Sequence, residues 1–301
     1  MEIPSTETFV ILFELYPAFF YTLVFIVSLM VGSFLNVVIY RLPIMMERSW
    51  QEEYQQYFSQ SQEQMVSPSS DTQTTFNLMK PNSTCPSCGH RIRAWENIPI
   101  LSYLFLNGKC AKCKVGISIR YPLVELFTAL ACTFAAIHFG PTASALWAVL
   151  FTYILIALLF IDLDKMLLPD QLTLPLLWIG LLISTQGIFV DTTDAIIGAT
   201  AGYLSLWSVY WLFKLATGKE GMGYGDFKLL AALGAYTGWQ GLPVVILLSS
   251  FVGAIAGILI MVLQNKGRSL AIPFGPYLAV AGWFTLLYKT EIIDAYLTWA
   301  L

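Results

Sequence analysis

The feature that most constrains this chain is a series of long apolar runs. An α-helix rises 1.5 Å per residue, so about 20 apolar residues cross the roughly 30 Å hydrocarbon core of a bilayer. Only 12% of the 301 residues are charged and 57% are hydrophobic, which leaves too few charges to cover a soluble surface. The sequence therefore predicts an all-α polytopic membrane protein, with candidate spans at 18–40, 121–139, 143–161, 171–190, 195–213, 229–264 and 271–288.

The run 229–264 is too long for one crossing. As a single helix it would extend about 54 Å. The turn sequence GWQGLP at 238–243 divides it into a short helix and a full one, which gives about eight transmembrane helices. The N-terminus lacks a positive region and a small-residue cleavage site, so we expect the first run to be a retained helix.

The charges of the loops predict the orientation. With eight spans and the N-terminus outside, the loops on one side hold every lysine and arginine except Lys289, so that side is expected to be cytoplasmic. If 229–264 crossed only once, Lys266 and Arg268 would move outside, so charge barely separates the two topologies. We expect an N-terminal segment with the first helix at 1–42, a cytosolic loop domain at 43–117 and a polytopic membrane core at 118–301. The net charge of -3 gives no reason to expect a nucleic-acid partner.

The cytosolic loop carries the metal-binding pattern. Its first part is rich in Gln and Ser and predicts disorder or a loose polar helix, and no internal repeat is evident. Two CxxC pairs follow, and four thiolates make a closed tetrahedral zinc site with structural rather than catalytic character. The predicted ligands are Cys85, Cys88, Cys110 and Cys113. Redox-active pairs are the main alternative, although their usual βαβ context is missing, and unliganded buried thiols are another. His90 is not needed as a ligand, and Cys132 is expected to be a small core residue.

Carboxylates at the ends of membrane helices are the candidate functional groups, because such acids are costly there. Asp162 directly follows the apolar third span, and Asp226 lies just before the run 229–264. Both fall at the predicted cytoplasmic ends of their helices, so they can meet at one depth. Asp170 follows a proline and is expected to cap a helix. Asp164 is expected to be solvated or ion-paired.

The sequence GMGYGDF gives Asp226 its specific context. An N-cap is the ordinary explanation for an acid after glycines. However, Gly221, Gly223 and Gly225 lack side chains along the strip before the acid, which would allow an extended substrate backbone to approach. A phosphate-binding loop is a poor alternative, because the GK[ST] element is missing and no strand precedes the segment. Two carboxyl groups in a low-dielectric site share a proton, so one can activate water while the other protonates a carbonyl, as in aspartic proteases.

At this point the sequence resembles a known family, the type IV prepilin peptidases, which act as leader peptidases and N-methyltransferases of bacterial inner membranes. The resemblance covers nearly the whole chain and rests on ordered stretches: GSFLNVVIYRLP, the two CxxC pairs, WENIP, RYPLVE, FIDLDKMLLPD and GMGYGDFKLLAALGAYTGW. It implies that Asp162 and Asp226 are the catalytic dyad and that the four cysteines form a zinc-binding element. It also implies prepilin and pseudopilin substrates, whose basic leader ends in glycine before an apolar helix. Cleavage at the cytoplasmic face and methylation with S-adenosylmethionine are further implications.

The residues for methyl transfer are not identified by the sequence. No soluble nucleotide-binding unit is evident, so the donor site must use the cytosolic loop and helix ends. Glu96 and Glu125 can position an amine or a sulfonium, and surface or ion-pair roles are equally consistent with the sequence. Arg41 is consistent with a positive-inside anchor, and Asn36 with a hydrogen bond to a neighbouring helix.

Three other readings of these residues remain open. A proton-coupled transporter would also carry membrane acids, but it predicts midplane positions and inverted repeats that are not seen. An intramembrane aspartyl protease of the presenilin type would lack methylation, and only the CxxC loop and the other stretches distinguish it. A non-catalytic, zinc-dependent assembly factor would keep its function without either aspartate.

Overall fold

The computed structural model describes residues 13, 15–60, 76–264 and 272–300. Within these ranges the regular structure is helical, with only isolated bridges of extended chain. The chain divides into two compact units, Met1–Ile26 with Thr128–Leu301, and Val27–Phe127. We call them the helical unit and the cysteine unit. Helices α2 (Pro17–Gln60) and α4 (Arg120–Phe139) contribute residues to both.

The helices confirm the predicted all-α polytopic membrane fold. Five of those in the described residues are long and apolar enough to cross a bilayer: α2, α4, α5 (Ala143–Lys165), α7 (Thr192–Thr217) and α9 (Leu242–Gln264). Helix α6 (Asp170–Ser184) is shorter than the predicted 171–190, and α10 (Gly275–Ala300) has a kink at Tyr288. The predicted division of 229–264 is confirmed, because α8 (Tyr224–Thr237) ends before α9 begins.

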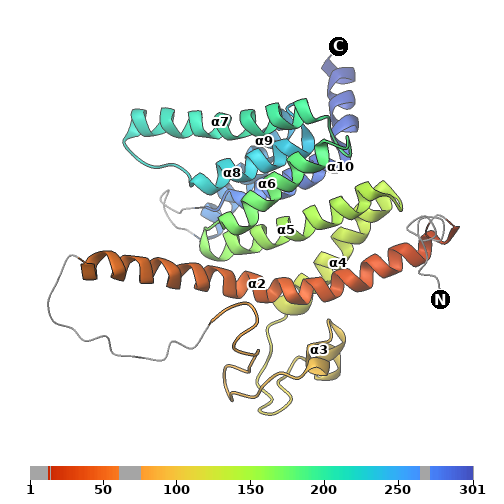
Figure 1. Cartoon of the computed structure of the whole chain (residues 1–301), viewed down its shortest axis with the longest axis vertical. Coiled ribbons are helices and arrows are strands. Elements are labelled where there is room, and N and C mark those ends of the chain that lie inside the picture. Colours follow the sequence, from red (N-terminus) through yellow and green to blue (C-terminus); the bar gives the residue numbers. More distant parts are fainter. Residues whose placement is uncertain (1–12, 14, 61–75, 265–271, 301) are drawn as a thin grey trace. The chain divides into compact units, whose positions relative to one another are not determined.

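Helix α8 is the centre of the helical unit. It contacts α6, α7, α9 and α10, and all of its residues from Asp226 to Thr237 are buried except Lys228. In Figure 1 it lies among these helices. Glycines allow the closest approach, since a Cβ on Gly234 would overlap the Gly198 carbonyl oxygen of α7. Apart from Asp226 and Lys228, the sequence of α8 is apolar or small on all sides, as is typical of a buried helix.

The cysteine unit includes the C-terminal part of α2, from Val27 onward. Although the first span was expected to end at residue 40, α2 continues through Pro43 to Gln60, and its residues 51–58 are exposed. The expected loose polar segment is thus helical as far as Gln60, and residues 61–75 lie outside the described ranges. Further along are a short 3-10 helix, η1 (Ala94–Asn97), and α3 (Leu101–Phe105).

Candidate functional site

The two aspartates singled out by the sequence lie together in the helical unit. Asp162 is in the last turn of α5 and Asp226 in the first turn of α8, and both are more than nine-tenths buried. Their carboxyl groups interact electrostatically. The structure thus brings together two acids from distant parts of the sequence, with their side chains largely out of water. Asp226 does not cap α8, because the N-cap residue is Gly223.

The two carboxyl groups have different hydrogen-bond environments. The backbone N–H of Gly275 donates to Oδ2 of Asp162 at 3.0 Å. Gly275 is the first residue of α10, where backbone N–H groups have no partner inside the helix and the helix dipole is positive. Oδ1 of Asp226 is buried without a hydrogen-bond partner. The difference between the two acids is therefore a backbone donor at Oδ2 of Asp162 and a buried oxygen without a donor on Asp226.

Sequence reasoning did not identify Gly275. The signal was available, since the sequence PFGP places a glycine between prolines at the start of the last helix. A Cβ on Gly275 would lie 2.6 Å from Oδ2 of Asp162 and 3.1 Å from Leu168 side-chain carbons. Only glycine therefore fits beside the aspartate at this position.

The structure corrects the interpretation of the glycines before Asp226. A Cβ on Gly225 would lie 2.7 Å from Cβ of Leu168, and a Cβ on Gly221 would lie 2.9 Å from the Phe213 ring. These two glycines are required by packing inside the protein rather than by the approach of a substrate. At Gly223 a Cβ would have no contact closer than 3.9 Å, and that contact is Oδ2 of Asp226. Only Gly223 leaves open space beside the acid.

The other two acids of these sequence segments, Asp164 and Asp170, have different surroundings. Asp170 is the first residue of α6 and follows the N-cap Pro169, so the predicted capping role is wrong. Its two carboxylate oxygens accept hydrogen bonds of 2.7 Å from Lys228 of α8. This ion pair links the start of α6 to the first turn of α8. Asp164 is exposed, as expected.

The four predicted metal ligands form one cluster in the cysteine unit. Their Sγ atoms all lie within 4.8 Å of one another, and those of Cys85 and Cys113 are 3.7 Å apart. Tetrahedral zinc with Zn–S bonds of about 2.3 Å requires sulfurs about 3.8 Å apart, so the cluster fits this ion. Backbone N–H groups of Cys113 and Lys112 lower the pKa of Cys110 to about 6, which favours the thiolate that a metal needs.

The two cysteine pairs are structural repeats, although no repeat was evident in the sequence. In the first, the Cys85 N–H donates to the His90 carbonyl, and Gly89 donates to the carbonyl of Cys85 with φ of 67°. In the second, Cys110 donates to Val115, and Lys114 donates to Cys110 with φ of 62°. Each turn is closed by one antiparallel bridge, Thr84 with Arg91 and Lys109 with Gly116. The sequence hides this repeat because Lys114 occupies the left-handed position that Gly89 occupies in the first turn.

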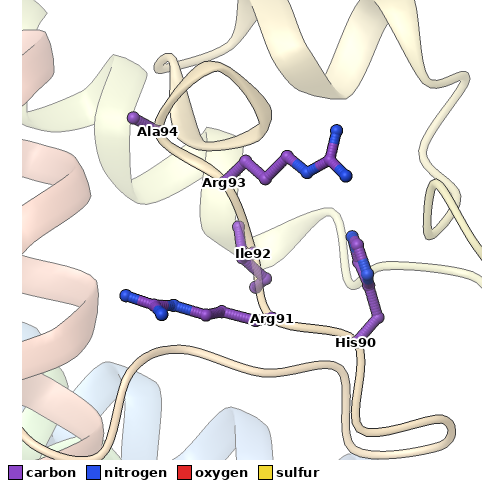
Figure 2. Close-up of a pocket in the computed structure, with 5 residues that line it drawn as sticks. All are labelled: His90, Arg91, Ile92, Arg93 and Ala94. Carbon is purple, nitrogen blue, oxygen red and sulfur yellow. The ribbon is translucent and has the colours of Figure 1, made fainter.

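The His90 side chain contacts Glu96 and is not part of the four-cysteine cluster. Its Nε2 lies 3.1 Å from Oε2 of Glu96, whose carboxylate also accepts from the Arg93 N–H at 3.0 Å. The Arg93 N–H and the His90 ring lower the pKa of Glu96 below its usual range. Residues 90–94 line a pocket of about 500 Å³. In Figure 2 the side chains of His90 and Arg93 point to one side of this segment and that of Arg91 to the other.

Three other polar residues hold the cysteine unit together. Glu125 of α4 is buried and accepts a hydrogen bond of 2.9 Å from the backbone N–H of Ile100. Asn36 of α2 donates to the Tyr121 carbonyl of α4, which confirms the predicted contact with a neighbouring helix. Arg41, which was expected to be a positive-inside anchor, is buried. Its guanidinium donates hydrogen bonds to backbone carbonyls of the segment 77–81.

Comparisons with known proteins agree with this architecture. Residues 26–139 match the bacterial peptidase A24 N-terminal domain, and residues 149–258 match the type IV leader peptidase family. Proteins named "Prepilin leader peptidase/N-methyltransferase" are similar over nearly their whole length. The one from Aeromonas hydrophila is 60% identical over 94% of this chain and 95% of its own, and the one from Pseudomonas aeruginosa is 55% identical over 95% and 96%. No solved structure matches this chain. With relatives this similar over nearly their full length, the chain belongs to the type IV leader peptidase family.

Proposed function

We propose that this protein is a membrane-embedded aspartic endopeptidase that removes the basic leader from type IV prepilins and pseudopilins. It then methylates the new N-terminal residue with S-adenosylmethionine. The observation that carries the peptidase assignment is the pair of buried, interacting carboxyl groups of Asp162 and Asp226. The names and near-complete coverage of the relatives support both activities.

The different surroundings of the two aspartates suggest their roles. Asp162, with its hydrogen bond from Gly275, acts as the carboxylate that takes a proton from the attacking water. Asp226 starts protonated and donates to the carbonyl oxygen of the scissile peptide bond. The hydroxyl oxygen bonds to the carbonyl carbon, which gives a neutral tetrahedral intermediate between Asp162–COOH and the Asp226 carboxylate.

The second half of the reaction returns both protons. Asp226 takes a proton back from one hydroxyl of the intermediate as the carbonyl forms again. Asp162 gives its proton to the departing nitrogen while the C–N bond breaks. The dyad ends as it began, and the net reaction consumes one water for each peptide bond. No covalent enzyme intermediate is needed.

Two of the acids near the dyad are paired with lysines, which bears on how the leader is recognised. Asp170 pairs with Lys228, and Glu220 pairs with Lys214 at 2.9 Å. The Lys214 ammonium lowers the pKa of Glu220 below its usual range. A basic leader would have to compete with these lysines, so selection of the substrate is proposed to rest on its apolar helix and its glycine rather than on acids of the enzyme.

The zinc ion is proposed to be structural. Cys85, Cys88, Cys110 and Cys113 would hold Zn²⁺ in a closed shell that stabilises the two turns and leaves no position for substrate. The methyl donor is proposed to bind elsewhere in the cysteine unit. The pocket of about 260 Å³ that is lined by Arg41, Arg91 and Arg93 is not a good candidate for this site. Its lining contains no acid, so the positive charge of the arginines opposes binding of a sulfonium cation.

A bacterial inner-membrane location is proposed from the bacterial relatives, and the loop charges support placing the dyad at the cytoplasmic face. Mass spectrometry of a purified prepilin incubated with this protein, with and without S-adenosylmethionine, tests the proposed function. We expect loss of the leader in both reactions and one added methyl mass on the new N-terminus only when the donor is present. An intact prepilin with folded, zinc-loaded protein would refute the peptidase assignment.

A further inference from the structure

The cysteine unit presents an unusual apolar surface on α3. Leu101, Leu104 and Phe105 lie on one helical face and are 52%, 63% and 83% exposed. The remaining aromatic residue of α3, Tyr103, faces the unit instead, since its hydroxyl donates to the Ile117 carbonyl and its ring lies against Gly108. Trp95 and Ile98, just before α3, are also about half exposed. Soluble surfaces rarely gather so many large apolar side chains in one short segment.

The charged residues in the sequence segment that contains α3, residues 97–119, are all basic. The sequence from residue 97 to residue 119 contains no aspartate or glutamate. Lys109, Lys112 and Lys114 are exposed, and none of them has an ion-pair partner among the residues that the structure describes. An apolar helical face that is followed closely in the sequence by lysines without ion-pair partners is complementary to anionic lipid headgroups above an acyl layer.

The hydrogen bonds of the cysteine unit place α3 at the level of the bilayer boundary. Asn36 lies near the cytoplasmic end of the first apolar run and contacts Tyr121, so α4 begins at that depth. Glu125 lies one turn further along α4 and bonds to the N–H of Ile100, the residue that directly precedes α3. Helix α3 is therefore held beside the first two turns of a membrane helix and not out in the solvent.

The backbone of Ile100, directly before α3, indicates that the position of α3 is fixed by its surroundings. Ile100 has φ of 59°, in the left-handed region, which is strained for a β-branched residue. Strain of this kind persists only where the surrounding structure fixes it. Here the fixing contact is the buried carboxylate of Glu125.

From these observations we propose that α3 is an interfacial helix that inserts Leu101, Leu104 and Phe105 into the bilayer while Lys109, Lys112 and Lys114 bind anionic phospholipid headgroups. The partner is the lipid surface of the leaflet in which α4 begins. This contact would hold the two cysteine turns against the membrane. It does not depend on the proposed peptidase activity.

Site-specific photocrosslinking of the full chain tests this proposal. The photoreactive residue p-benzoylphenylalanine replaces Phe105 in nanodiscs that contain phosphatidylglycerol and phosphatidylcholine, without any prepilin. The control replaces Gln51, which is also exposed but lies on α2 about 22 Å beyond Asn36 along the helix axis. We expect severalfold more lipid adduct at position 105 than at position 51. Equal yields, or adducts at position 105 only with peptides of the protein, would overturn the proposal.

A second measurement tests the lysines separately. The triple variant Lys109→Gln, Lys112→Gln, Lys114→Gln carries the same photoreactive residue at position 105. We expect the phosphatidylglycerol share of the adducts to fall toward its share in the nanodisc. An unchanged share would contradict the assignment of these lysines to anionic headgroups. Zinc content, measured in the same samples, shows whether the variant keeps its fold.

Discussion

Asp162 accepts a hydrogen bond from the backbone N–H of Gly275, and the same glycine leaves no room for a side chain beside that carboxylate. Helix α10 thus positions an aspartate that lies on α5. The partner Asp226 has an oxygen without any hydrogen bond in the same buried environment. This difference between the two carboxyl groups underlies the proposed division into base and acid.

Substitution of Gly275 tests the positioning of Asp162. In Gly275→Ala, the new Cβ would lie 2.6 Å from Oδ2, so the carboxylate must move. We expect kcat for leader removal to fall about 100-fold, as is typical when a catalytic group is displaced by about 1 Å. The control is Gly257→Ala on α9, whose Cβ meets only the flexible end of Ile272. Near-normal kcat in Gly275→Ala would contradict the positioning role.

The glycines before Asp226 are expected to separate into two functional classes. Gly225→Ala forces a Cβ against Leu168, so we expect the free energy of unfolding to fall by about 1–3 kcal/mol. Gly223→Ala meets nothing closer than 3.9 Å, so we expect normal thermal stability but a higher KM for the prepilin. Thermal unfolding in detergent and steady-state kinetics on the same samples check both. A destabilised Gly223→Ala with unchanged KM would show that the open space at this glycine has no role in substrate approach.

The cysteine cluster predicts a metal content that substitution can remove. We expect one zinc ion per chain in the wild type and almost none in Cys85→Ser, because a closed site needs all four thiolates. Methylation should fall through loss of the fold of the cysteine unit. Cys132→Ser is the control, since Cys132 is buried in the helical unit and should leave zinc unchanged. Elemental analysis of the purified proteins measures the zinc content per chain. Unchanged zinc content in Cys85→Ser would refute the four-thiolate site.

The repeat of the two cysteine turns predicts opposite responses at equivalent positions. Gly89→Ala puts a side chain at φ of 67°, which costs about 1 kcal/mol although no atom lies near. Lys114→Gly removes a side chain from the same conformation in the second turn, so this cost disappears. We expect faster zinc release to a chelator in Gly89→Ala and unchanged or slower release in Lys114→Gly. The reverse order would mean that the two turns are not equivalent.

The sequence predicted those parts of the site that depend on the type and position of side chains along the chain. Acids at the ends of apolar runs identified Asp162 and Asp226, and CxxC spacing identified the cysteines. It did not predict Gly275, because a backbone N–H donor has no side-chain signature and its partner lies far away in the sequence. Nor did it predict why Gly221 and Gly225 are glycines, since the reason is close packing against Phe213 and Leu168.

The fold shows the same division. Apolar length and the GWQGLP turn predicted separate helices on either side of residues 238–241. Apolar length did not predict that α2 continues to Gln60, because a helix can extend into a polar segment beyond the end of its apolar run. Asp170 was predicted to be a cap from its local context, but its ion pair with Lys228 depends on how α6 and α8 pack.

Leader removal by aspartate variants tests the central claim most directly. Wild type, Asp162→Asn, Asp226→Asn and the matched control Asp164→Asn would each be incubated with a purified prepilin in detergent, and the rate of leader loss followed by mass spectrometry. We expect no detectable cleavage by Asp162→Asn or Asp226→Asn and near-normal cleavage by Asp164→Asn, an exposed acid two residues from the dyad. Cleavage at the wild-type rate by either dyad variant would contradict the account.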